Sequence, residues 1–276
     1  MTKAVAVGKI KIGNGNPLVI IAGPCVVESR ELALKVARDA KRIAGKLKLP
    51  FIYKSSYKKA NRSSGETFTG IGMDEALKVL AEVKKEIEVP ILTDVHSVDE
   101  VEAASEVADV LQIPAFLCRQ TELLQAAGRT HKAVNIKKGQ FMAPEDMRLQ
   151  AEKVEAVGNS KVMLTERGTT FGYHNLVVDM RSLVIMSRSG YPVILDTTHS
   201  LQLPGGEKDR TGGQPEFIFP IARAGAAAGI DGLFLETHPD PRKALSDAST
   251  QLQFDLFEPL LIQVSRIDRA RREVVK

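Results

Sequence analysis

The stretch MDEALKVLAEVKKEIEVPILTDVHSVDE (residues 73–100) contains one complete unit of the pattern that decides the fold of this 276-residue chain. Its first half predicts a helix over 73–87, because apolar residues recur three or four positions apart and form one stripe. The apolar run at 90–94 predicts a short buried strand. Ser97 and Glu100 then have the spacing of a capping box, which opens a further helix.

Units of this kind recur along the whole chain. Strands are expected at 18–22, 50–54, 90–94, 109–113, 132–136, 161–165, 192–196 and 231–235. Helices are expected at 30–47, 73–87, from 97 onward, and at 119–127, 146–157, 180–190, 215–228 and 247–265. Buried strands joined by helical crossovers indicate a parallel sheet, so the fold class is α/β. Eight such units fit a (β/α)8 TIM barrel, and a doubly wound open sheet is the alternative.

The residues ahead of the first unit alternate between apolar and polar types. This alternation predicts a short N-terminal β-hairpin within about residues 1–17. No linker rich in Pro, Gly or Ser divides the rest of the chain, so we expect one barrel domain over 1–276.

The composition favours a protein that binds small anions. The net charge is +4, but the chain has no Trp and only 4 Tyr, so aromatic platforms for single-stranded nucleic acid are scarce. No apolar run is long enough for a membrane span, and the first residues lack a signal-peptide pattern. Two cysteines do not make a disulfide framework. We therefore expect a cytoplasmic protein that binds neither nucleic acid nor membrane.

Ionisable and polar residues gather where the predicted strands end. They are Cys25, Lys54, Asp94 with His96, Gln112, Lys137, Glu166 with Arg167, Asp196 with His199, and Glu236 with His238. The strand starts carry plain residues such as Pro50, Pro90 and Pro192. Because the reactive groups of a (β/α)8 barrel come from the carboxyl ends of its strands, this asymmetry predicts an active site there.

Three of these residues, Cys25, His199 and Glu236, are candidate metal ligands together with Asp247. In a closed barrel the last strand pairs with the first, which brings Glu236 near Cys25. Thiolate, imidazole and carboxylate ligands together suit Zn²⁺, Fe²⁺ or Mn²⁺. The alternative is structural, with Cys25 as a small buried hydrophobe and the others hydrogen-bonded in the core. The residue types alone leave both interpretations open.

A second group of residues is cationic. It comprises Lys54, Lys58, Lys59 and Arg62 in YKSSYKKANRSS (53–64), with Arg119, Lys137, Lys138 and Arg167 from later units. Converging Lys and Arg side chains bind phosphate and carboxylate groups. Lys58 and Lys138 are expected to be solvated surface charges. The long polar loop at 203–214 is of the kind that closes over a substrate. No P-loop or GxGxxG pattern occurs, so no organic cofactor is expected.

Long blocks of the chain resemble one enzyme family, 3-deoxy-D-manno-octulosonate 8-phosphate synthase, also called 2-dehydro-3-deoxyphosphooctonate aldolase. The blocks are IAGPCVVES, KSSYKKANRSS, QIPAFLCRQTELL, VNIKKGQF, LTERGTTFGYHNLVVDMRSL, DTTHSLQLPGG and FLETHPDPRKALSDASTQL, and they extend from about residue 18 to 255. The related DAHP synthases typically have Lys-Pro-Arg-Thr where this chain has Lys59-Ala-Asn-Arg62.

The resemblance implies a homotetrameric (β/α)8 barrel that condenses phosphoenolpyruvate with D-arabinose 5-phosphate and water. The products are 3-deoxy-D-manno-octulosonate 8-phosphate and phosphate, in lipopolysaccharide (KDO) biosynthesis. Condensation with erythrose 4-phosphate, as in DAHP synthases, is the alternative. Cys25 stands where the metal-independent branch has Asn, so the chain is similar to the metal-dependent branch, with Cys25, His199, Glu236 and Asp247 as ligands.

The resemblance also implies roles for individual residues. Those implied for phosphoenolpyruvate are Lys54, Ser56, Lys59, Gln112, Ala115, Phe116, Lys137 and Arg167. Those implied for the pentose phosphate are Asn61, Arg62 and Ser63, with Arg119 reaching a site across a subunit boundary and Asp94 near the sugar hydroxyls. Lys59, Asn61, Asp94 and His199 are the implied catalytic residues.

Overall fold

The computed structural model describes residues 2–60, 68–205 and 212–274, and it contains a closed parallel β-barrel. The barrel strands are β3 (Val19–Gly23), β4 (Phe51–Lys54), β5 (Ile91–Asp94), β6 (Val110–Ile113), β7 (Ala133–Lys137), β8 (Val162–Glu166), β11 (Val193–Asp196) and β14 (Gly232–His238). Consecutive strands pair in parallel, and β14 closes the ring because it pairs with both β11 and β3. The predicted (β/α)8 barrel is confirmed.

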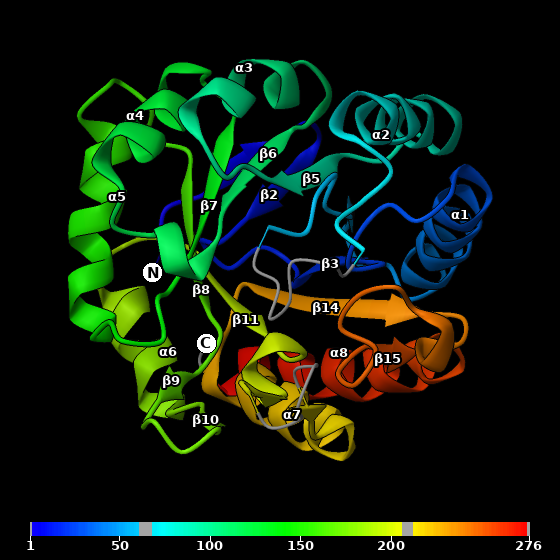
Figure 1. Cartoon of the computed structure of the whole chain (residues 1–276). Helices are drawn as coiled ribbons and strands as arrows, with labels where there is room; N and C mark the ends of the chain where they lie inside the picture. Colours follow the sequence, from blue (N-terminus) through cyan, green and yellow to red (C-terminus); the bar gives the residue numbers. More distant parts are fainter. Residues whose placement is uncertain (1, 61–67, 206–211, 275–276) are drawn as a thin grey trace.

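Helices surround the strands (Figure 1). Within the described residues they are α1 (Arg30–Lys46), α2 (Met73–Ile87), α3 (Val98–Val107), α4 (Thr121–Arg129), α5 (Met147–Glu155), α6 (Met180–Arg188), α7 (Ile218–Ala228) and α8 (Phe257–Val274). Short 3-10 turns occur at Ala115–Leu117, Pro144–Asp146, His199–Leu201, Pro215–Phe217, Pro241–Lys243 and Phe254–Leu256. The minor strands are β9 (Thr169–Thr170), β10 (Leu176–Val177), β12 (Gln202–Leu203), β13 (Gly212–Gly213) and β15 (Leu252–Gln253).

The barrel interior changes from apolar to polar along its axis. Alternate side chains of a strand point to opposite faces, so one set of each strand faces the helices and the other faces inward. Near the strand starts the inward set forms an apolar cluster of Val19, Ile21, Ile52, Leu92, Val110, Ala133, Met163, Ile194 and Phe234. Two positions further along, the inward residues include Lys54, Asp94, Gln112, Asn135, Thr165, Asp196 and Glu236. The fold therefore directs the polar groups to the carboxyl ends of the strands.

The N-terminal hairpin closes the other end of the barrel. Strands β1 (Val5–Val7) and β2 (Ile10–Ile12) pair antiparallel, which confirms the predicted hairpin. Val5, Val7 and Ile12 are buried in the apolar interior cluster with the first residues of the barrel strands. The hairpin thus covers the apolar base and leaves the polar end as the mouth.

The last predicted helix, 247–265, is wrong in its bounds, because α8 spans Phe257–Val274. Asp247 has φ of 47°, which an α-helix does not accommodate. The chain then forms β15, which pairs in parallel with the last residues of β14, before the helix begins. Tertiary pairing with β14 thus overrides the local helical pattern.

Gly23→Ala is expected to lower the free energy of unfolding by about 3 kcal/mol, because a Cβ at this position meets backbone that cannot yield cheaply. It would lie 2.0 Å from the carbonyl oxygen of Lys54 on the paired strand. Gly45→Ala in α1 is the control, since open space surrounds it, and it should stabilise by up to about 1 kcal/mol. Denaturant unfolding measures both, and equal effects of the two variants would contradict the close packing of β3 on β4.

Among the described residues, no helix is both long enough and apolar enough to cross a membrane.

Candidate active site

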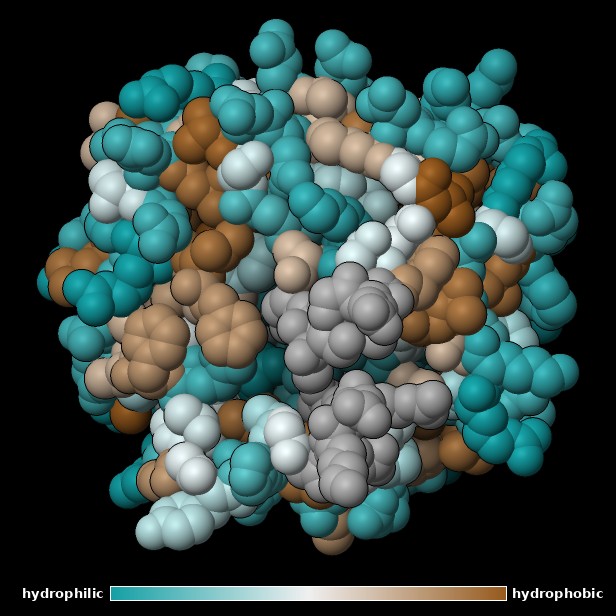
Figure 2. Space-filling model, viewed as in Figure 1, coloured by the Kyte–Doolittle hydropathy of each residue, from teal (hydrophilic) through white to brown (hydrophobic). Residues whose placement is uncertain are grey.

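A pocket of about 230 Å³ opens at the mouth of the barrel. Figure 2 shows hydrophilic side chains at the bottom of a hollow in this face. The loops after β4 to β8, the turn at His199 and strand β14 all contribute to its wall. Its lining residues are Lys54, Ser56, Lys58, Lys59, Ala60, Asp94, His96, Pro114, Ala115, Phe116, Leu117, Lys137, Gln140, Arg167, His199 and Glu236.

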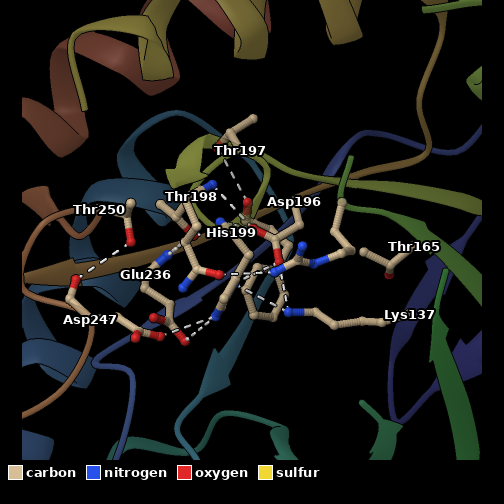
Figure 3. Close-up of polar contacts among 12 residues, drawn as sticks. Lys137, Thr165, Asp196, Thr197, Thr198, His199, Glu236, Asp247 and Thr250 are labelled. Carbon is tan, nitrogen blue, oxygen red and sulfur yellow. Dashed lines mark hydrogen bonds and ion pairs between the residues drawn. The ribbon is translucent and has the colours of Figure 1, made fainter. Parts of the chain in front are cut away.

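The structure brings the four candidate metal ligands together. One ligand atom from each of Cys25, Glu236 and Asp247 lies within 4.8 Å of the others. His199 Nε2 lies 3.5 Å from Glu236 Oε1 and 3.5 Å from Asp247 Oδ2 (Figure 3). Glu236 is level with Gly23 in the register of β14 and β3, which explains why Cys25 is beside it. Closure of the ring therefore creates the cluster.

These residues fit a divalent cation. Glu236 Oε2 is buried and has no hydrogen-bond partner among the described residues, so one carboxylate oxygen is left for a ligand. Cys25 Sγ lies 3.2 Å from Ser246 Oγ and 3.4 Å from Asp247 Oδ2. The thiol therefore has polar neighbours, unlike a cysteine that packs as a small hydrophobe. Burial raises the pKa of the Cys25 thiol well above its usual range, and the charges of Asp247 and Glu236 raise it further. A bound cation opposes all three influences, because it stabilises the thiolate.

Asp196 orients His199. Its Oδ2 lies 2.8 Å from His199 Nδ1, and its Oδ1 accepts hydrogen bonds from the backbone N–H groups of Thr198 and His199 (Figure 3). Burial disfavours the charge, yet His199 and Lys137 hold the pKa of Asp196 well below its usual range. With Nδ1 bonded to this carboxylate, Nε2 is the nitrogen that faces Glu236 and Asp247, as a metal-ligating histidine requires.

Three buried lysines neutralise the carboxylates around this cluster. Lys54 Nζ lies 2.6 Å from Glu236 Oε1, Lys137 Nζ lies 2.6 Å from Asp196 Oδ2, and Lys59 forms an ion pair with Asp247. Burial opposes the charge of Lys54 and Lys59, but the neighbouring carboxylates outweigh it and raise the pKa of both. Lys54 and Lys59 therefore stay charged although they are buried.

The ring of Phe234 supports two of these ammonium groups. Lys137 Nζ lies 4.2 Å and Lys54 Nζ 5.5 Å from its centroid. A ring face attracts cations, so this one inward aromatic side chain holds both lysines at the floor of the pocket.

Arg167 presents an unsatisfied buried cation. It follows β8, and its Nη2 donates to Gln202 Oε1 at 3.0 Å. Its Nη1 is buried without a hydrogen-bond partner in the described part of the chain. Burial lowers the pKa of this guanidinium, and Asp196 is the foremost of the carboxylates that oppose the shift. Such a group at a pocket wall can bind the carboxylate or phosphate of a ligand.

Some of the other predicted substrate residues line the pocket and some do not. Ser56 donates a short hydrogen bond to Asp94 at the pocket wall, and Ala115 and Phe116 also line the pocket. Gln112 is fully buried beneath the pocket and does not line it. Arg119 is exposed and outside the pocket of its own chain. Asn61, Arg62 and Ser63, and residues 206–211 of the predicted closing loop, lie outside the described residues.

Lys138 corrects one prediction. It was expected to be a solvated surface charge, like Lys58, but its side chain is only 1% exposed, whereas Lys58 is 48% exposed. Lys138 Nζ lies 3.0 Å from Thr169 Oγ1 and 3.5 Å from Glu166 Oε1. The partner carboxylate comes from the neighbouring strand, which the sequence around Lys138 does not reveal.

Two site residues were missed from the sequence. Gln140 lines the pocket, and its buried Oε1 has no partner within the described ranges. Ser246 lies against the Cys25 thiol. Their positions, three residues after Lys137 and one before Asp247, were the only available signals.

Comparison with known proteins gives consistent results. A family model described as the DAHP synthetase I family matches residues 1–272. A 2-dehydro-3-deoxyphosphooctonate aldolase of Acidithiobacillus ferrooxidans is 55% identical over 256 residues, which cover 93% of this chain and 91% of that protein. Proteins of the same name from Trichlorobacter lovleyi and Geobacter sulfurreducens are 52% and 49% identical, over 99% and 97% of this chain and 100% and 98% of their own lengths.

Proposed function

The chain belongs to the DAHP synthetase I family, and we propose that it condenses phosphoenolpyruvate with D-arabinose 5-phosphate and water. The products are 3-deoxy-D-manno-octulosonate 8-phosphate and inorganic phosphate, in the KDO branch of lipopolysaccharide biosynthesis. This choice of reaction is supported by relatives that are named 2-dehydro-3-deoxyphosphooctonate aldolase and that align with nearly the whole chain. The observation that carries the proposal is the barrel mouth, where buried cations adjoin a metal-type set of ligands.

The buried cations solve the main physical problem of this reaction. Both substrates carry phosphate, so they repel each other strongly wherever water is excluded. We assign phosphoenolpyruvate to the part of the pocket where Arg167 Nη1 has no hydrogen-bond partner among the described residues and where Lys54 and Lys137 form ion pairs. Lys59, Ser56 and the turn at Ala115–Phe116, which also line the pocket, complete its site.

The pentose phosphate lies nearer the rim in this proposal. The Asp94 carboxylate accepts hydrogen bonds from its hydroxyl groups, and Asn61, Arg62 and Ser63 hold its phosphate. The proposed assembly is a homotetramer, in which Arg119 reaches the same phosphate from a neighbouring subunit. We place the enzyme in the cytoplasm, where the free thiol of Cys25 stays reduced.

The bonds change as follows. C3 of phosphoenolpyruvate attacks the aldehyde carbon, and water adds at C2 while the proton it loses is taken up by the new alkoxide. The C2–O bond to phosphate then breaks, the C2 hydroxyl proton leaves with the phosphate, and C2 becomes a keto carbon. Lys59 is the cation that contacts both Asp247 and Cys25, and it stabilises the negative charge that develops on the aldehyde oxygen. A divalent ion held by Cys25, His199, Glu236 and Asp247 would supply further positive charge for orienting the aldehyde or the water.

Phosphate release with two alternative sugars tests this function. With phosphoenolpyruvate present, we expect kcat/KM for arabinose 5-phosphate to exceed that for erythrose 4-phosphate by at least about a hundredfold. The control omits the sugar and should release no phosphate. A preference for erythrose 4-phosphate would favour the DAHP synthase alternative that the family description allows.

A further inference from the structure

Four polar side chains form a continuous row inside the barrel, beneath the pocket. We call this row, Asp94, Gln112, Asn135 and Thr165, the polar ladder. It crosses the neighbouring strands β5, β6, β7 and β8. Gln112 Nε2 lies 2.7 Å from Asp94 Oδ1, Asn135 Nδ2 lies 2.8 Å from Gln112 Oε1, and Thr165 Oγ1 lies 2.7 Å from Asn135 Oδ1. Gln112, Asn135 and Thr165 have no exposed surface, so only Asp94 reaches the pocket.

The chemistry of its end groups fixes the direction of the ladder. An ionised carboxylate only accepts hydrogen bonds, so Gln112 must turn its NH₂ group to Asp94 and its oxygen to the next strand. Asn135 must then present its NH₂ group to that oxygen, and its own oxygen faces Thr165. The Thr165 hydroxyl is therefore the donor that ends the row. Burial disfavours the charge of Asp94, but Lys54 and Lys137 hold the pKa of its carboxyl below the usual range, which keeps this direction.

We propose that Asn135 and Thr165 are positioning residues, which fix the amide of Gln112 and through it the carboxylate of Asp94 that faces the sugar substrate. This inference rests on the proposed function for the identity of that substrate. Asp94 has one oxygen bonded to Gln112 and the other to Ser56, so both set its plane. Without the Thr165 donor the buried Oδ1 of Asn135 has lost its hydrogen-bond partner, and the cost of that unpaired oxygen favours tilting or turning the two amides out of the arrangement that Asp94 requires. A turned Gln112 amide sets oxygen against oxygen at Asp94 and rotates the carboxylate.

Stability alone does not account for the polar ladder. One layer lower, the same strands carry Leu92, Val110, Ala133 and Met163, so the interior is readily filled by apolar residues. A fully paired buried network contributes little net stability, yet it is costly when one member is unpaired. What such a network does provide is a single arrangement of its groups, and here that arrangement ends on a pocket residue.

The test compares Thr165→Val with Thr165→Ser. Val has nearly the shape of Thr but cannot donate, whereas Ser retains the hydroxyl. We expect Thr165→Val to raise the KM for arabinose 5-phosphate about tenfold and the KM for phosphoenolpyruvate less than about twofold. Thr165→Ser should restore the KM for the sugar. Equal rises for both substrates, or equal behaviour of Val and Ser, would overturn the proposal.

A second variant favours the opposite orientation of the Gln112 amide and keeps the size of the side chain at position 135. Asn135→Asp has two accepting oxygens, which demands that Gln112 turn its NH₂ group away from Asp94. We expect it to raise the KM for arabinose 5-phosphate at least as much as Thr165→Val does. Normal KM values for both substrates in Asn135→Asp would contradict the proposed role of the hydrogen-bond direction in the polar ladder. This variant still tests the proposal if Thr165→Val does not fold.

A readout independent of turnover separates this inference from the proposed function. In wild-type protein the side-chain NH₂ groups of Gln112 and Asn135 should exchange slowly with solvent hydrogen, as followed by ¹⁵N NMR. Thr165→Val should accelerate the exchange of both groups, including Gln112 two strands away, and Thr165→Ser should not. If wild type condenses neither sugar, the proposed function fails while this result still tests the polar ladder. Unchanged exchange in Thr165→Val would refute it.

Discussion

Cys25→Ala should bind less divalent metal than wild type and reduce kcat by more than about a hundredfold, because it removes one of the four proposed metal ligands. The Cys25 thiol lies beside Asp247, Ser246 and Lys59, and alanine leaves no ligand atom at that position. Metal content by elemental analysis and phosphate release are measured on the same preparation. Wild-type protein treated with a chelator should lose activity in parallel and regain it when Zn²⁺, Fe²⁺ or Mn²⁺ is returned.

Cys118→Ala is the matched control, because Cys118 is the other buried free cysteine and lies at the end of the 3-10 turn after β6. It should keep wild-type metal content and activity. Full activity in metal-free Cys25→Ala would disprove the metal role. Cys25→Asn asks a finer question, since an amide can hydrogen-bond where the thiolate ligated. Activity of this variant without metal would show that the ion mainly positions groups.

Arg167→Lys is the second large effect that we expect. Lysine keeps the charge but has one nitrogen, so it cannot bond Gln202 and an anion together as the guanidinium can. The KM for phosphoenolpyruvate should rise about ten- to a hundredfold, and that for the pentose phosphate much less. Steady-state kinetics with each substrate varied in turn measures this split.

Arg223→Lys provides the comparison for that experiment. Arg223 also donates to a glutamine, Gln263, at 3.3 Å, but on the exposed surface of α7. This variant should leave both KM values unchanged. If Arg167→Lys raised the two KM values equally, Arg167 would not be specific for phosphoenolpyruvate.

The barrel was predictable because its signals are local. Each strand is a short apolar run, each helix has its own stripe, and the polar residue after each strand marks the mouth. The convergence of Cys25 and Glu236 followed from the fold itself, because closure pairs the strands that carry them. These inferences need only the order of elements along the chain.

What the sequence did not reveal depends on register between strands. Lys138 was taken for a surface charge because its partner, Glu166, is on the next strand. Asn135 and Thr165 were missed, because side-chain pairing across strands sets their contacts. The helix expected from 247 failed for a related reason, since the segment that forms β15 pairs with the end of β14. Neighbours of this kind are fixed only when the sheet is assembled.

The pairing of β14 with β3 also bears on how the protein is made. It joins the first barrel strand to the last, and Cys25 and Asp247 are 222 positions apart along the chain. Contacts of such separation form late, because a long loop must close before they give any stabilisation. A nascent chain that has not yet released β14 exposes two unpaired sheet edges, on β3 and β11, where other chains can add. The ribosome must therefore deliver nearly the entire polypeptide before the catalytic mouth can exist.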